Sequence, residues 1–190
     1  GTTAMMPTLL SSTLSTYQAG IAAVDKAMQS GNPSILGLHI EGPFFDSGRR
    51  GAHNAEMIRT MDQADIDWLI GANLPLMLTL APEHCQAGVI EKLTEAGLMI
   101  CAGHTDASAE QIRAALREGL RGFTHLFNAM SQITARSPGA VGAALDDVQT
   151  WVGIIADGHH VHPINLSLAH RAKADGKVCL VTDAMSTVGS

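Results

Sequence analysis

Residues 35–45 read ILGLHIEGPFF, and this stretch is the clearest guide to the architecture. The part from Ile35 to Ile40 is almost wholly apolar, which is typical of a strand covered on both faces. The run then ends on a carboxylate, Glu41, and Gly42-Pro43 stops the strand there. Because the strand is apolar and ends on a carboxylate, we expect Glu41 to have a compensating partner at that end of the strand.

Six other short apolar runs, rich in Val, Ile, Leu and Ala, repeat this pattern. They cover residues 4–10, 74–81, 98–104, 122–125, 151–156 and 178–182. Helical patterns lie between most of them, over residues 17–30, 55–70, 83–96, 108–120 and 163–175. A serial alternation of strands and helices predicts a parallel sheet with helical crossovers.

Seven strand candidates in one open series predict an α/β fold of the (β/α)8 TIM-barrel type, with a doubly wound sheet as the alternative. A complete barrel needs about 250 residues, whereas this chain has 190. We therefore expect residues 1–190 to form one partial barrel domain with about strands 2–8. The first strand and the last helix are expected to be missing.

Composition excludes several classes of partner. The net charge of −6 argues against a nucleic-acid surface, and the apolar runs are too short to span a bilayer. Three widely separated cysteines favour a reducing, cytoplasmic setting with buried thiols. The N-terminus has no basic segment or cleavage site of a signal peptide.

Polar side chains follow several of the strand candidates. Glu41, His104, His125 and Asp183 each lie at the end of an apolar run. Taken singly, such a histidine is usually a rim residue, and such an aspartate usually caps the next helix. In a barrel, however, the carboxyl ends of the strands converge, so these side chains are expected to meet.

One glutamate and two histidines form a suitable ligand set for one divalent ion. Zinc is the expected metal, with iron or another divalent ion as the alternative. Three protein ligands leave a position for water, which the ion would activate. Asp183 is the best-placed carboxylate to accept the proton of that water and to return it to a leaving amine.

The chain contains, in order, the motifs GLHIEGPFF, RRGAHN, AGHTDAS, THLFNAMSQITARSPG, IIADGHHVHP and CLVTDAM. This series resembles the N-acetylglucosamine-6-phosphate deacetylase family of the amidohydrolase superfamily, and the resemblance covers the chain from end to end. It implies metal-dependent hydrolysis of the acetamide of N-acetylglucosamine 6-phosphate, which yields glucosamine 6-phosphate and acetate.

The resemblance also implies roles for individual residues. The metal ligands would be Glu41, His104 and His125, and the catalytic acid and base would be Asp183. The substrate contacts would be Ala52, His53, Asn128, Ala129, Arg136 and His160. Among these, His53 would help to polarise the acetamide carbonyl, while Arg136 and His160 would bind the phosphate. Arg136 would do so in the site of the neighbouring subunit, which implies a homodimer.

The resemblance gives no ligand role to His39, which it makes a supporting residue, or to His159 and His162, which we interpret as rim residues. The family's polar pair on the first strand and its small β domain have no counterpart in residues 1–190, so we expect one ion. Two alternatives stay open. The chain could act on another cyclic or linear amide, or it could be a barrel fragment that binds metal or sugar phosphate without catalysis.

Overall fold

The computed structural model describes residues 3–185, which form one parallel sheet with helices between its strands. The strands are β1 (Thr8–Leu9), β2 (Leu38–Glu41), β3 (Leu76–Leu80), β4 (Met99–Ala102), β5 (Gly122–Phe123), β6 (Trp151–Ile155) and β7 (Val178–Val181). The α-helices are α1 (Leu14–Gln29), α2 (Gln63–Gly71), α3 (Val89–Glu95), α4 (Ala109–Arg117), α5 (Gly139–Asp146) and α6 (Pro163–Ala172). Short 3-10 helices cover Ser47–Arg49, Ala55–Met57 and Pro82–His84. No helix in the described range is long and apolar enough to cross a membrane.

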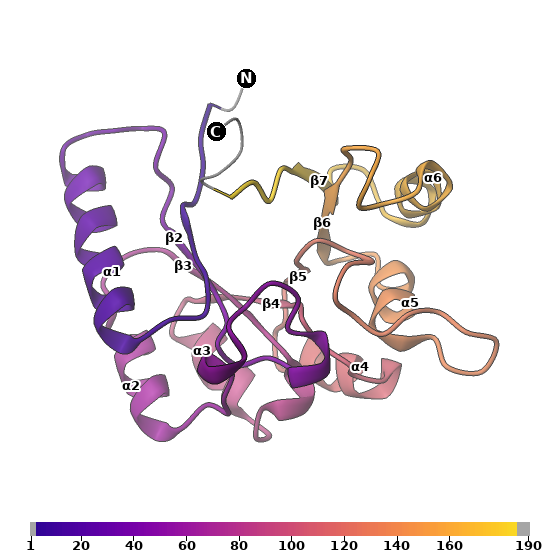
Figure 1. Cartoon of the computed structure of the whole chain (residues 1–190), viewed down its shortest axis with the longest axis horizontal. Coiled ribbons are helices and arrows are strands. Elements are labelled where there is room, and N and C mark those ends of the chain that lie inside the picture. Colours follow the sequence, from indigo (N-terminus) through magenta and orange to yellow (C-terminus); the bar gives the residue numbers. More distant parts are fainter. Residues whose placement is uncertain (1–2, 186–190) are drawn as a thin grey trace.

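The strands follow one another in the sheet in their order along the chain, and every neighbouring pair is parallel. A doubly wound sheet reverses its strand order at a switch point. No reversal occurs among the described strands, so that alternative is wrong. Figure 1 shows the strands as a curved wall, with α1–α4 on its outer side at the left and below, and α5 and α6 at the right. The prediction of a partial TIM barrel is confirmed.

The strands are shorter than the apolar runs that predicted them. Residues 35–45 yield only β2, and residues 4–10 yield only β1 plus an isolated bridge between Met5 and Ile35. The apolar runs are longer than the strands because apolar residues outside the hydrogen-bonded strands are also buried in the core. Phe44, for example, lies three residues after the end of β2 and is 1% exposed.

Two helix predictions were wrong in their first halves. Residues 55–70 contain a 3-10 turn and then extended backbone, and α2 begins only after Asp62, which forms a capping box with Asp65. Residues 83–96 are interrupted by Gly88, whose φ of +81° lies in the left-handed region, and α3 begins directly after it. In contrast, α4 begins close to the predicted start at residue 108, where Ser108 and Gln111 form a capping box.

Two further expectations need correction. Helix α5 was not predicted, because it consists mainly of Gly and Ala and so lacks a periodic pattern of large apolar residues. Strand β7 was expected to be covered on both faces, but Cys179, Leu180 and Val181 are exposed. Of the cysteines, Cys101 is buried as expected, Cys85 is half-buried and Cys179 is exposed.

The two faces of the sheet carry different residues. Alternate strand positions supply large apolar side chains to the buried core beneath the helices, namely Leu38, Ile40, Leu78, Leu80, Ile100 and Phe123. The positions between them, which point to the opposite face, include His39, Glu41 and Thr79, and all three are buried. The interior face of the curved sheet therefore carries buried polar side chains, whereas the face beneath the helices is apolar.

An ion pair supports the loop that follows Glu41. The guanidinium of Arg59 contacts both carboxylate oxygens of Asp65 at 2.5 and 2.6 Å, and it lies 5.2 Å from the centroid of the Phe44 ring. The backbone N–H of Arg59 also donates to the carbonyl of Pro43. Asp65 is 4% exposed, so its charge depends on these partners, and Arg59 holds its pKa below the usual range against the opposing effect of burial.

We expect Arg59→Met to destabilise the fold by about 2 kcal/mol, because it leaves the buried carboxylate of Asp65 without its cation. Urea unfolding followed by circular dichroism measures this loss. Arg113→Met is the matched control, since Arg113 and Asp146 form an exposed pair, and it should change stability by less than about 0.5 kcal/mol. Equal losses of stability in the two variants would show that Arg59 contributes no more to the fold than an exposed arginine does.

Candidate metal centre

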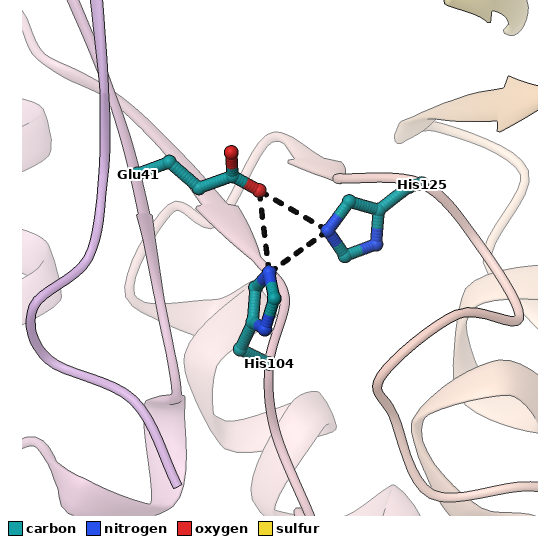
Figure 2. A group of neighbouring side chains, drawn as sticks. All are labelled: Glu41, His104 and His125. Atoms are coloured by element: carbon teal, nitrogen blue, oxygen red, sulfur yellow. Dashed lines mark hydrogen bonds and ion pairs between the residues drawn. The ribbon is translucent and has the colours of Figure 1, made fainter. Parts of the chain in front are cut away.

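Glu41, His104 and His125 meet at one point on the interior face of the sheet. Oε1 of Glu41 lies 3.3 Å from Nε2 of His104 and 3.1 Å from Nε2 of His125. The two Nε2 atoms are 3.0 Å apart. Figure 2 shows the three side chains pointing toward one another from separate segments of the chain. All three residues are at most 5% exposed. The structure thus brings together the three residues that the sequence predicted as ligands.

The spacing of these three atoms fits a divalent ion. Donors about 2.0–2.1 Å from a tetrahedral zinc are separated by about 3.3–3.4 Å. The observed separations of 3.0–3.3 Å are close to this value. Two imidazole nitrogens and one carboxylate oxygen also form the donor set that zinc and iron accept. The residues present therefore fit a metal ion with three protein ligands.

The backbone fixes the tautomer of His104. Its Nδ1 lies 2.8 Å from the carbonyl oxygen of Arg49, which can only accept a hydrogen bond, so Nδ1 carries the proton. In the neutral ring, Nε2 then presents a lone pair to Glu41 and His125. A second hydrogen bond of this kind is typical of metal-bound histidines. A lone pair facing a carboxylate is repulsive unless a proton or a metal cation lies between them, so this geometry suits a metal site.

The electrostatics of the centre favour positive charge. Burial opposes the ionised form of Glu41, but its histidine neighbours outweigh that effect and hold the pKa of Glu41 well below its usual range. Burial likewise lowers the pKa of His125, yet the bond to Glu41 and the charges of Glu41 and Asp183 produce a net increase. A buried carboxylate that stays ionised beside an imidazole that tends to be charged is a site for a proton or a metal cation.

Strained backbone marks the same region. The non-glycine residues with positive φ in the described chain are His104, His125, Phe127, Ala129 and Asp183. Such conformations are costly for ordinary residues and concentrate at functional sites. All five follow the carboxyl ends of β4, β5 or β7, where barrel chemistry is found. The strain thus coincides with four of the predicted site residues.

His53 lies against the metal centre with a defined tautomer. Its ring meets the His104 ring edge to face at 4.6 Å between centroids. Its Nδ1 lies 3.2 Å from the backbone nitrogen of Ser11 and 2.8 Å from the Ser11 hydroxyl. A backbone N–H can only donate, so Nδ1 is the acceptor and Nε2 carries the proton. Burial lowers the pKa of His53 to about 4, so the ring is a neutral donor at pH 7.

Close packing holds this pair of rings in place. The Phe45 ring stacks on His104 with centroids 4.2 Å apart, and His53 meets the edge of the same phenyl ring. Gly42 makes the approach of Ser11 possible, because a Cβ at that position would lie 2.2 Å from Ser11 Oγ. Gly42 also has a φ of +88°, which disfavours any other residue. The GPFF segment therefore shapes the site as well as ending the strand.

Asp183 lies near the candidate metal centre but is not one of its three converging residues. Its charge contributes to the raised pKa of His125, and its own side chain is exposed. It follows the end of β7, as the sequence predicted. The structure therefore provides a carboxylate near the ligands that is accessible to water.

The other predicted contact residues lie farther along the loops. Asn128 and Ala129 are half-buried after β5, and Nδ2 of Asn128 has no hydrogen-bond partner among the described residues. Ala52 is exposed beside His53. Arg136 is exposed in the loop before α5, which projects from the body in Figure 1. His160 is exposed, and its Nδ1 is 2.6 Å from Asp157.

Several residues near the site were not identified from sequence. Ser11 and the carbonyl of Arg49 orient the two histidines, and no local pattern marks either of them. His162, interpreted as a rim residue, is exposed and caps α6 by accepting a bond from the N–H of Ile164. A second polar group, Asp46, Glu83 and His84, also has donor atoms within 4.8 Å of one another. Glu83 there already accepts bonds from Thr105 and Asp106, so it supports the loop after His104.

Comparisons with known proteins show which proteins this chain resembles. The chain is 42% identical to N-acetylgalactosamine-6-phosphate deacetylase of Shewanella sp. (strain ANA-3), with 100% of this chain and 48% of the relative aligned. It is 37% identical to N-acetylglucosamine-6-phosphate deacetylase of Vibrio furnissii, with 100% of this chain and 48% of the relative aligned. The chain thus spans about half the length of the curated relatives it matches. No protein-family model matches it.

Among solved structures, N-acetylglucosamine-6-phosphate deacetylase from Pasteurella multocida superposes with a TM-score of 0.92 at 34% identity. That match covers 97% of this chain and 49% of the other. The whole described sheet therefore has a counterpart in about half of a longer protein.

Proposed function

We propose that this chain, a homologue of the N-acetylglucosamine-6-phosphate deacetylases that spans about half their length, is the metal-holding part of an amidohydrolase. The reaction is hydrolysis of the acetamide of an N-acetyl-hexosamine 6-phosphate, which gives the free amine and acetate. N-acetylglucosamine 6-phosphate is the principal substrate. Its galacto epimer is the second, because relatives named for each of the two sugars align with this chain.

The observation that carries the proposal is the buried group of Glu41, His104 and His125. These residues would hold one divalent ion, with zinc the first choice. Such an ion, when bound, would polarise a carbonyl group and lower the pKa of a water molecule, which becomes a strong nucleophile once it loses a proton. The remaining chemistry falls to side chains of this protein.

We assign stabilisation of the developing negative charge to His53 and proton transfer to Asp183. The Nε2–H of His53 donates to the acetamide oxygen and stabilises the negative charge that develops there. The carboxylate of Asp183 accepts the proton of the attacking water and returns it to the departing amine nitrogen. Asp183 suits this task because it is accessible and lies outside the ligand group.

Phosphate recognition is assigned to Arg136 and His160. A guanidinium is a permanent cation with paired donors that match phosphate oxygens, and Arg136 is exposed on a projecting loop. We propose that it reaches the site of a second subunit in a homodimer. Asn128 and Ala129 contact the sugar phosphate, and Ala52 contacts the substrate beside His53. We also propose a cytoplasmic location, since all three cysteines are free thiols.

We expect Arg136→Ala to raise KM for N-acetylglucosamine 6-phosphate at least about tenfold with a smaller change in kcat, because one charge-assisted phosphate contact is lost. Steady-state kinetics measure this split. Arg117→Ala, which removes an exposed arginine on α4, is the control and should leave both constants unchanged. An unchanged KM in Arg136→Ala would mean that phosphate binding depends on other residues.

The direct test of the function is acetate release from N-acetylglucosamine 6-phosphate, its galacto epimer and unphosphorylated N-acetylglucosamine. The proposal predicts turnover of a phosphorylated sugar and at least about tenfold lower kcat/KM for the unphosphorylated one. Hydrolysis of a cyclic amide such as dihydrouracil, with no release from the three sugars, would favour the alternative amidohydrolase. Metal binding without any turnover would favour a binding role.

A further inference from the structure

A line of hydrogen bonds crosses the interior face of the sheet just before the metal ligands. Thr8 Oγ1 lies 3.0 Å from His39 Nδ1, and His39 Nε2 lies 2.7 Å from Thr79 Oγ1. Thr79 Oγ1 in turn lies 2.7 Å from Thr124 Oγ1. The line starts on β1, passes through β2 and β3, and finishes at the residue after β5. His39 and Thr79, its central members, are 5% and 0% exposed.

Two members of the line lie one or two residues before a proposed metal ligand in the sequence. His39 precedes Glu41 by two residues on β2, so both side chains point to the same face. Thr124 immediately precedes His125. The line therefore connects β2 to the end of β5 close to Glu41 and His125. It does so although β3 and β4 lie between these two strands in the sheet.

Gly103, the residue before His104, leaves room for the line to pass over β4. A Cβ at this position would lie 2.6 Å from Thr79 Cγ2 and 3.2 Å from Thr124 Cβ. Any side chain there would push the two threonines apart. The third ligand-bearing strand thus has a gap where the hydrogen bond between β3 and β5 crosses it.

The chemistry of the line gives it a fixed geometry. A neutral imidazole has one donor and one acceptor nitrogen, and both nitrogens of His39 have a hydroxyl partner. The threonine hydroxyls can donate in one direction along the whole line, so every contact can be satisfied. Because an unpaired polar atom in this buried position is costly, the ring is held in one orientation.

We propose that Thr8, His39, Thr79 and Thr124 form a positioning layer that sets the separation of Glu41 from His125 and so tunes the affinity and geometry of the metal centre. None of the four belongs to the group of three converging donor residues. The inference rests on the proposed metal centre. It accounts for the burial of two polar side chains, His39 and Thr79, on the interior face of the sheet.

Thr79→Val is the sharpest test, since it keeps the shape of the side chain and removes only the hydroxyl at the middle of the line. We expect its zinc affinity, measured by competition with a chromophoric chelator, to fall about tenfold, in the range seen when outer-shell contacts are removed. The absorption spectrum of the cobalt-loaded protein should shift. Thr79→Ser, which restores the hydroxyl, should return both properties to within about twofold of wild type.

Thr150→Val is the matched control. Thr150 is another buried threonine, and its hydroxyl bonds to Lys173 rather than to the positioning layer. We expect this variant to unfold at a lower urea concentration but to keep the wild-type zinc affinity and cobalt spectrum. Thr124→Val, at the half-buried end of the line, is the second test variant and should weaken zinc binding in the same direction if Thr79→Val does not fold.

The outcomes separate the layer from the metal centre itself. If the wild-type protein binds no zinc, the proposed metal centre is wrong and the layer is wrong with it. If the wild type binds zinc and folded Thr79→Val or Thr124→Val binds it within twofold with an unchanged cobalt spectrum, only the positioning layer is wrong. A selective loss of affinity in the layer variants, with rescue by serine, supports it.

Discussion

Asp183→Asn is expected to lower kcat by about a thousandfold while leaving the metal content of the protein at the wild-type level. The amide keeps the size of the side chain but can no longer accept the proton of the attacking water. Asp183 lies outside the group of three converging ligand atoms, so its loss should not release the ion. Steady-state acetate release and elemental analysis of the same preparation measure the two quantities.

The control for this variant is Asp175→Asn, which changes an exposed carboxylate in the turn after α6 and should retain wild-type turnover. Wild-type kcat in Asp183→Asn would remove Asp183 from the reaction. A loss of metal that accompanies the loss of turnover would instead make Asp183 a ligand, and a second carboxylate would then have to move the proton.

Glu41→Gln is expected to weaken metal binding at least about a hundredfold and to abolish measurable turnover, because one charged ligand of three is replaced by a neutral amide. The substitution is isosteric, so the buried position of the side chain should be kept. Chelator competition measures the affinity, and acetate release measures the activity.

Glu83→Gln separates this site from the second polar group. Asp46, Glu83 and His84 also bring three donor atoms together, but the oxygens of Glu83 already accept bonds from Thr105 and Asp106. We expect Glu83→Gln to keep the wild-type metal affinity. If it loses the ion while Glu41→Gln retains it, the metal site lies in the second group and the assignment made here is wrong.

The meeting of the three candidate ligands could be predicted from the sequence, because each ends an apolar run in a serial β-α pattern. Parallel strands bring such ends to one edge, and the register then places Glu41, His104 and His125 within hydrogen-bond distance. The prediction needed only strand order and direction. It did not require exact boundaries, several of which were wrong by many residues.

The contacts that orient the ligands could not be predicted in the same way. The bond of Ser11 to His53 and that of Arg49 to His104 join segments 42 and 55 residues apart. Each depends on loop conformations with positive φ, which the local sequence does not specify. His39 was interpreted only as a supporting residue, since its partners Thr8 and Thr79 become neighbours only when the register between strands is known.

The most direct test of the metal-dependent function is acetate release from N-acetylglucosamine 6-phosphate by protein stripped of metal and then reloaded. We expect the stripped protein to release no acetate above background, and one equivalent of zinc or another divalent ion per chain to restore turnover. Release that continues at the original rate after the metal is removed would show that the reaction does not depend on a metal.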